Sequence, residues 1–211
     1  MWPPEALEFL RDLEENNDTA WFRANRARYE QCLLAPARKL ADKLSDLGRP
    51  HFFRPYNNLR FRPGPPLKEQ LGVAIGYGAV GGFYFELSLD GLLVAAGLHR
   101  PAADQLERFR AAMDDDRRAR GFIRGLSAAR RAGLNPSEPV LKRAPRGYAM
   151  DHPRIDHLRR RELTVSCRHA LEPWLHEPVC DERVGAGLRS ARSLVKWLAE
   201  NVGPSNRPVR A

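Results

Sequence analysis

The chain has 211 residues, 43% of them hydrophobic, and a formal net charge of +9. A chain of this length buries enough surface to fold without a disulfide or a metal, and Cys32, Cys167 and Cys180 lack the paired spacing of zinc or disulfide frameworks. It shows neither a secretory signal pattern nor an apolar run of about 18 residues that would span a membrane. We therefore expect a cytoplasmic protein without membrane contact, bound metal or cofactor.

The positive charge has two interpretations. The 35 lysines and arginines exceed the 26 aspartates and glutamates, which favours an anionic partner. However, 30 of these cations are arginines interleaved with acids, and a bias in composition produces the same excess without any ligand. Clustering of the charge on one face would favour the anionic partner, because the footprint of a nucleic acid is concentrated.

Three helices are predicted in the N-terminal part. Apolar residues recur at helical spacing in residues 5–17. A second helix follows over residues 19–34, capped by Asp18 or Thr19. A third starts at Pro36, because proline suits the first turn of a helix, and ends at the following glycine.

The middle of the chain predicts a sheet. Residues 71–77 and 82–90 are strand-like runs, and Asp90-Gly91 is a tight-turn signal that leads into a third run over residues 92–100. Neighbouring strands joined by such short links are antiparallel, because parallel strands need a longer crossover. We therefore expect an antiparallel sheet as the core.

Helices are predicted again after the sheet. One starts at Pro101 and is divided from a second helical piece at Gly121, and closing helices are expected over residues 169–174 and 184–201. The fold class is therefore α+β, with N-terminal, middle and C-terminal helices packed on a central antiparallel sheet. We expect a single domain over residues 1–202 and a disordered tail over residues 203–211.

The basic segment, residues 141–165, holds the densest group of side chains able to contact a ligand, LKRAPRGYAMDHPRIDHLRRRELTV. Its first cations precede a Gly-Tyr turn, and Pro153 suits the first position of a helix that His152 would cap. Backbone N–H groups at a helix start favour anions, so the expected partner is a phosphorylated small molecule or a nucleic acid. Alternatively, Arg143 and Arg146 pair with surface carboxylates or cap carbonyls. The predicted ligand-binding residues are Arg60, Lys68, Lys142, Arg143, Arg146, Tyr148 and His152.

Two further arrangements would suit acid–base chemistry. His152 and Asp156 would share a helix face, as an acid–base or metal pair does. A zinc site needs more ligands, and the alternative is that Asp156 supports Arg160 while His152 only caps a helix. Alternation along a strand also puts Tyr84 and Glu86 on one face. There, Glu86 is either a general base in a cleft or a surface charge.

Five segments carry a family resemblance. They are WFRANRARYE (21–30), LRF (59–61), GFYFELS (82–88), AAGLHRP (95–101) and LKRAPRGYAMDHPRIDHLRRREL (141–163). Together they resemble a family called domain of unknown function 2461, from about Glu5 to Asn201. The resemblance implies a single-domain layout, with no established activity, substrate or catalytic residue. The chain departs from the family pattern at Asn57-Asn58, where relatives have Arg-Asp, and in the following RPGPPLKEQ.

Three functions of different classes remain. The preferred one is a cytosolic binding module for a phosphorylated or nucleic-acid ligand that uses the basic segment. The second is an uncharacterised enzyme with acid–base residues near Glu86 and His152, and the third is a protein-interaction scaffold. The sequence contains no P-loop, dinucleotide glycine fingerprint, serine nucleophile elbow or HExxH motif. The glycine-rich GYGAVGG at residues 76–82 is expected to join two strands.

Overall fold

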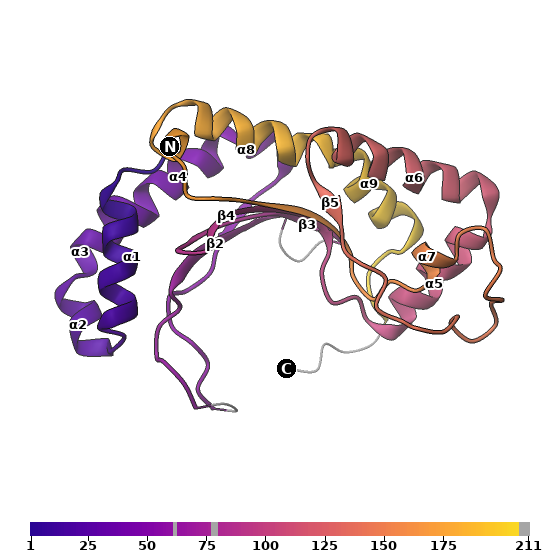
Figure 1. Ribbon diagram of the computed structural model, residues 1–211, viewed down its shortest axis with the longest axis horizontal. Helices are drawn as coiled ribbons and strands as arrows, with labels where there is room; N and C mark the ends of the chain where they lie inside the picture. Colours follow the sequence, from indigo (N-terminus) through magenta and orange to yellow (C-terminus); the bar gives the residue numbers. More distant parts are fainter. Residues whose placement is uncertain (61–62, 77–79, 207–211) are drawn as a thin grey trace. The chain divides into compact units, whose positions relative to one another are not determined.

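A computed structural model of the protein describes residues 1–60, 63–76 and 80–206 (Figure 1). The chain divides into two compact units. Unit 1 consists of Met1–Ile75, Tyr84–Val94 and Arg168–Ala186, and unit 2 consists of Gly76–Phe83, Ala95–Cys167 and Gly187–Ala211. The expected single domain over residues 1–202 stays a prediction.

Within the described residues, six strands form one antiparallel sheet in the order β1-β2-β3-β4-β6-β5. They are β1 (Pro50–Phe52), β2 (Gln70–Ile75), β3 (Gly82–Ser88), β4 (Gly91–Leu98), β5 (Asn135–Pro136) and β6 (Leu163–His169). The predicted α+β class and the hairpin turn at Asp90-Gly91 are confirmed. The sequence did not predict β1, β5 or β6. The predicted strand link over residues 76–82 lies partly outside the described residues.

Unit 1 holds the N-terminal helices, one later short helix and a part of the sheet. Its helices are α1 (Glu5–Glu15), α2 (Thr19–Ala24), α3 (Arg26–Arg28), the π-helix η1 (Tyr29–Leu34), α4 (Ala35–Lys43) and the 3-10 helices η2 (Ser45–Leu47) and η3 (Pro173–His176). Asp18 caps α2 as predicted, because its carboxylate accepts from the Ala20 and Trp21 N–H groups at 2.8 and 2.9 Å. The expected helix over residues 169–174 is wrong, because β6 extends to residue 169 and η3 begins at Pro173.

The single helix predicted over residues 19–34 is divided in the structure. Asn25 leaves the helical conformation with φ −102° and ψ 13°, and its side-chain amide donates to the Trp21 carbonyl at 3.0 Å. An asparagine side chain competes in this way for the carbonyls that a helix needs. The core of this region is an aromatic cluster in which the Phe22 and Tyr29 rings lie 5.2 Å apart and Phe9 contacts both.

Unit 2 is organised around helices that pack on one another. They are α5 (Ala103–Asp114), α6 (Asp116–Arg131), α7 (Ile155–Leu158) and α9 (Arg192–Asn201), and α8 (Val179–Ser190) runs into this unit from unit 1. Figure 1 shows α6 and α9 side by side. Their close approach requires Gly121, since a Cβ at this position would collide with the Trp197 ring. The break predicted at Gly121 is therefore wrong, and the helices divide at Asp115, whose carboxylate accepts from the Arg118 N–H at 2.7 Å.

The core of unit 2 is also aromatic. The Phe122 ring lies 5.2 Å from Phe109 and 5.1 Å from Trp197. The predicted disordered tail starts within this unit. Its first residues, 203–206, are hydrogen-bonded to α5 through Gln105, Arg108 and Asp104, and residues 207–211 lie outside the described residues. Among the described helices, none combines the length and the apolarity that a membrane crossing requires.

We predict that Gly97→Ala destabilises the protein strongly. Gly97 in β4 has a φ of 121°, and a Cβ there would collide with the Leu163 carbonyl oxygen on β6. Urea denaturation should show the free energy of unfolding lowered by about 3 kcal/mol or more. Gly133→Ala is the matched control, because it has a φ of 84° but nothing near the added Cβ, and should cost about 1 kcal/mol. Equal losses would contradict the close approach of β4 and β6.

Candidate anion-binding site

The basic segment is fastened to α5 by Arg154. Its guanidinium Nε donates to the Met113 carbonyl at 2.5 Å, Nη2 donates to the Asp114 carbonyl at 3.0 Å, and Nη1 contacts the Asp116 carboxylate at 2.7 Å. Met113 and Asp114 are the last residues of α5, where carbonyl groups have no partner within the helix. Arg154 therefore caps the C-terminal end of α5, where a cation is also favoured by the helix dipole.

Two further arginines hold the ends of the segment. Arg110 on α5 donates from Nε to the Leu158 carbonyl at 3.2 Å. Leu141 donates from its N–H to the Arg159 carbonyl at 3.1 Å, and the Arg159 guanidinium donates back to the Leu141 carbonyl. The segment thus closes on itself beside α5. Its first part, residues 141–154, is a loop without helix or strand and lies at the same helix.

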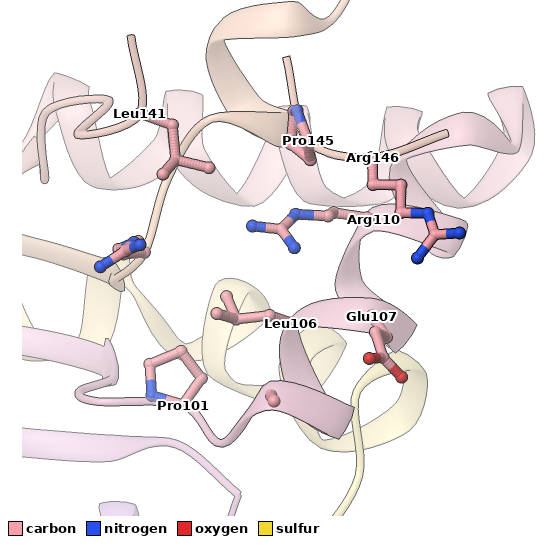
Figure 2. Close-up of a pocket in the computed structure, with 9 residues that line it drawn as sticks. Pro101, Leu106, Glu107, Arg110, Leu141, Pro145 and Arg146 are labelled. Carbon is pink, nitrogen blue, oxygen red and sulfur yellow. The ribbon is translucent and has the colours of Figure 1, made fainter. Parts of the chain in front are cut away.

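Between the loop and α5 lies a hollow of about 510 Å³, which we call the arginine hollow (Figure 2). It is lined by Pro101, Ala103, Leu106, Glu107, Arg110, Leu141, Pro145, Arg146 and Arg161. Figure 2 shows the Arg110 side chain extending between Leu141 and Leu106, with the Arg146 guanidinium and the Glu107 carboxylate beside it. Its volume is within the range of roughly 300–1,000 Å³ that small-molecule sites occupy.

The hollow is electropositive. Burial lowers the pKa of Arg110, and the nearby Arg161 lowers it further, while Tyr148 and Glu107 act in the opposite direction. In the part of the chain that the structure describes, none of Arg110, Arg146 and Arg161 forms an ion pair. Their positive charges are therefore available to a ligand.

The N-terminal end of α5 also faces this hollow, since Pro101, Ala103 and Leu106 line it. The N-cap residue, Ala102, has no side-chain acceptor for the first N–H groups of the helix. Only the reverse contact is made, in which the Gln105 side chain accepts from the Ala102 N–H at 2.9 Å. These uncapped N–H groups add to the positive potential of the hollow.

The structure separates the predicted residues of the basic segment. Arg146 lines the arginine hollow, and Tyr148 lies close enough to Arg110 for the two to influence each other's pKa. Lys142 and Arg143 are exposed and do not line it. Sequence reasoning missed Arg110, Glu107 and Arg161 as residues of the hollow. Arg110 and Glu107 lie on α5, and no motif there distinguished them from ordinary surface charges.

His152 is held in a turn and not at a helix start. Its Nδ1 accepts from the Arg154 N–H at 3.0 Å, and its Nε2 lies 3.1 Å from the Asp114 carboxylate. The helix predicted from Pro153 is wrong, because α7 begins at Ile155 and has four residues. The expectation of an anion site at that helix start is therefore wrong. The His152 ring packs edge-on against the Tyr148 ring, with the ring centroids 6.1 Å apart.

The pairing of His152 with Asp156 has no support in unit 2. Asp156 lies 3.7 Å from the Arg159 guanidinium, so it does not form the predicted pair with Arg160 either. Within residues 1–60, 63–76 and 80–206, no three His, Cys, Asp or Glu side chains are grouped as metal ligands would be.

Arg60 and Lys68 belong to unit 1. Lys68 donates from Nζ to the Arg54 carbonyl at 3.0 Å and lies over the Phe53 ring, and burial together with Arg54 lowers its pKa. Arg60 is exposed, and its backbone N–H donates to Asn58 Oδ1 at 3.3 Å. A shared site with the basic segment stays a prediction. Residues 61–62, in the altered part of the family pattern, lie outside the described residues.

The prediction that Tyr84 and Glu86 share a face of β3 is confirmed. The Tyr84 hydroxyl donates to the Glu86 carboxylate at 2.6 Å, and Gln70 on β2 donates to the same oxygen at 2.7 Å. Arg168 on β6 approaches the other oxygen at 3.5 Å. Glu86 is only 7% exposed, so it is a partnered, buried carboxylate. The enzyme hypothesis stays a prediction, as does the scaffold hypothesis.

Comparison with known protein families gives a match. The model of a family described as "Conserved hypothetical protein (DUF2461)" matches residues 5–197. No curated protein and no solved structure matches the chain. The description of the family assigns no activity.

We predict that Tyr84→Phe lowers the free energy of unfolding at pH 7 by about 1–3 kcal/mol, because Glu86 loses a buried donor. Burial and the neighbouring Glu86 raise the pKa of Tyr84. The folded protein therefore keeps a proton that the unfolded chain loses above about pH 10. Wild type should lose stability relative to the variant as the pH rises beyond this value. Urea denaturation of both proteins from neutral to alkaline pH measures the difference, and a difference that does not change with pH would contradict the interpretation.

Proposed function

We propose that this chain, which belongs to the DUF2461 family of conserved hypothetical proteins over residues 5–197, binds a small phosphorylated molecule in the arginine hollow. The observation that carries the proposal is the gathering of Arg110, Arg146 and Arg161 around one hollow, without an ion pair to any of them in the described chain. Guanidinium groups present forked donors that match phosphate oxygens.

The burial of Arg110 adds to this support. Removing a cation from water is unfavourable, and the lowered pKa of Arg110 reflects that cost. A bound anion would offset the cost by direct attraction. The Arg110 Nε donates to the Leu158 carbonyl, which fixes the side chain in place. Its two Nη groups remain as donors to the ligand.

The rest of the lining indicates what else the ligand carries. Leu106, Leu141 and Pro145 offer apolar surface, which suits a carbon framework. Glu107 would repel a bare anion but would accept a hydrogen bond from a hydroxyl or amino group. We therefore expect a phosphate monoester with hydroxyl or amino substituents, such as a sugar phosphate or a nucleotide.

A small molecule is favoured over a nucleic acid strand. Binding to a strand requires a series of cations that follows the phosphate backbone. Three arginines instead line one hollow of about 510 Å³, and Arg108, Arg154 and Arg159 of the same unit donate to main-chain carbonyls. We place the protein in the cytosol, where thiols stay reduced. Consistent with this, Cys32 donates its thiol hydrogen to the Arg28 carbonyl, and burial raises the pKa of the Cys180 thiol to about 11.

We predict that the full chain binds glucose 6-phosphate or adenosine 5′-monophosphate, as measured by isothermal titration calorimetry. Arg146→Met should raise the dissociation constant at least tenfold, because one charge-assisted hydrogen bond to the ligand contributes about 1.5–3 kcal/mol. Arg143→Met is the matched control. Arg143 is exposed on the same loop and does not line the hollow, so this variant should bind as wild type does.

Two results would contradict the proposal. One is an equal loss of affinity in Arg143→Met and Arg146→Met, which would mean that only the net charge of the loop matters. The other is a failure of both small probes while a random-sequence oligonucleotide binds with a steep dependence on salt. That second result would make the basic segment a nucleic-acid surface.

We also predict a change of selectivity in Glu107→Gln. Inorganic phosphate should bind this variant more tightly than wild type, because the repulsion from a carboxylate is removed. Glucose 6-phosphate should gain less or lose affinity, since its hydroxyls lose a charged acceptor. The ratio of the two dissociation constants, measured by calorimetry, should therefore shift toward inorganic phosphate. An unchanged ratio would show that Glu107 does not contact the sugar.

A further inference from the structure

The exposed face of α6 carries a row of arginines. Six of the 16 residues of this helix are arginines, and Asp116 is its one acid. At about 3.6 residues per turn, four of these arginines fall within an arc of about 60°. All four are exposed, and we call them the α6 row: Arg117, Arg120, Arg124 and Arg131. The row extends over about 21 Å, because a helix rises by about 1.5 Å per residue.

The packing of α6 on α9 turns this row outward. A Cβ at Gly125 would come within 3.0 Å of the Leu194 Cα, so the two helices approach closely here. Trp197 on α9 donates from its indole N–H to the Arg118 carbonyl at 2.9 Å, which fixes the rotation of α6 about its axis. Figure 1 shows α5 and α9 both below α6 in unit 2. The row lies on the face of α6 that these contacts leave uncovered.

The acids at the start of α6 do not neutralise the row. The Asp115 carboxylate lies 3.7 Å from the Arg118 guanidinium. Asp116 accepts a hydrogen bond from Arg154 at 2.7 Å. In the part of the chain that the structure describes, none of the four arginines of the row forms an ion pair. Their charges are therefore available to a partner.

The stability of α6 does not explain the row. Arg117 is in the first turn, where the helix dipole disfavours a cation. Arg120 and Arg124 are four residues apart, and like charges at this spacing repel each other. Arg131, in the last turn, is favoured by the dipole, but the other three cations lower the stability of the helix. A polyanion laid along the row would remove this repulsion.

We propose that the α6 row binds the phosphate backbone of double-stranded DNA. Guanidinium groups present forked donors that match phosphate oxygens. A series of cations along one line suits a polymer of phosphates, because the footprint of a nucleic acid is concentrated on one face. The row shares no residue with the arginine hollow, so the inference does not rest on the proposed function.

The other residues of α6 favour duplex DNA over other polyanions. Single strands are bound by stacking bases on aromatic rings, but Phe122, the one aromatic residue of α6, is buried. RNA duplexes are recognised through their 2′-hydroxyls, but Ser127, which carries the one hydroxyl of α6, donates to the Ile123 carbonyl at 2.8 Å. A helix that lies on a membrane buries an apolar face in it, and the apolar face of α6 packs on α9.

The test is the binding of a labelled DNA duplex of about 20 base pairs to the full chain, followed by fluorescence anisotropy. Contacts to four phosphates predict a slope of about −3.6 when the logarithm of the affinity is plotted against that of the salt concentration. Raising sodium chloride from about 50 to about 200 mM should therefore weaken binding about a hundredfold. No binding at the lower salt concentration overturns the inference.

The double variant Arg120→Gln/Arg124→Gln should bind the duplex at least about tenfold more weakly at low salt, and its slope should be about half as steep. The matched control is Arg11→Gln/Arg23→Gln, which removes the same charge from exposed positions of unit 1. This control should bind as wild type does. Equal losses in the two double variants would mean that only the net charge of the protein matters, which overturns the inference.

Thermal unfolding checks that the loss of binding is not a loss of structure. Arg120→Gln/Arg124→Gln should unfold at the wild-type temperature or above it, because a repulsion is relieved. A lower unfolding temperature would show that these arginines support the fold, which overturns their assignment to DNA. Glucose 6-phosphate should bind this variant as it binds wild type, so the proposed function is judged separately.

Three further titrations test the choice of partner and of surface. An RNA duplex of the same sequence and phosphatidylserine vesicles should both bind more weakly than the DNA duplex. Tighter binding of either one overturns the choice of DNA, even if the α6 variants weaken it. Arg146→Met should keep the affinity for the DNA duplex. If this variant loses it while Arg120→Gln/Arg124→Gln keeps it, the DNA surface is the basic segment and the α6 row is not a site.

Discussion

The arrangement of unit 2 depends on the cap that Arg154 forms over the C-terminal end of α5. Its fork takes the Met113 and Asp114 carbonyls and the Asp116 carboxylate, so it joins the end of α5, the start of α6 and the basic segment at one point. Without this cap, two helix carbonyls would lack partners and the segment would lose its main attachment. The loop that carries Arg146 faces the other end of α5 because the segment is anchored here.

The same cap explains the position of His152. The backbone N–H of Arg154 donates to the imidazole, whose other nitrogen faces Asp114. His152 therefore orients Arg154, which caps α5. The His152 ring also packs against Tyr148. The expected helix cap is thus, in this structure, a support for the arginine beside it, and an acid–base role of His152 stays a prediction.

The sequence predicted those elements that depend on interactions between residues close together in the chain. The carboxylate of Asp18 reaches N–H groups two and three residues ahead, and the turn at Asp90-Gly91 joins adjacent strands, so both were predicted. Gly121 was misread as a breaker, because its role is to admit the Trp197 ring from a helix far along the chain. Strand β6 was missed for the same reason, since pairing with β4 and β5 determines it.

The candidate site shows the same limit. The basic segment was recognised by its composition, and Arg146 does line the hollow. Arg110 and Glu107 were not recognised, because they face the loop only after the chain has closed over α5, and helical periodicity alone does not reveal which charged face another segment will cover. Arg160 gave no signal either, since a run of arginines in sequence predicts exposure, and its burial follows from tertiary packing.

Under the proposed function, the net charge of +9 is more than a bias in composition. Arg108, Arg154 and Arg159 donate to main-chain carbonyls. These guanidiniums stabilise the folded chain and contribute little to attracting a ligand. The cations on which the proposed function depends are Arg110 and Arg146, which line one hollow and form no ion pair within the described chain. Because a guanidinium fixed by one hydrogen bond loses little entropy when it binds an anion, an arginine-rich chain can derive both its folding contacts and its ligand contacts from a single residue type.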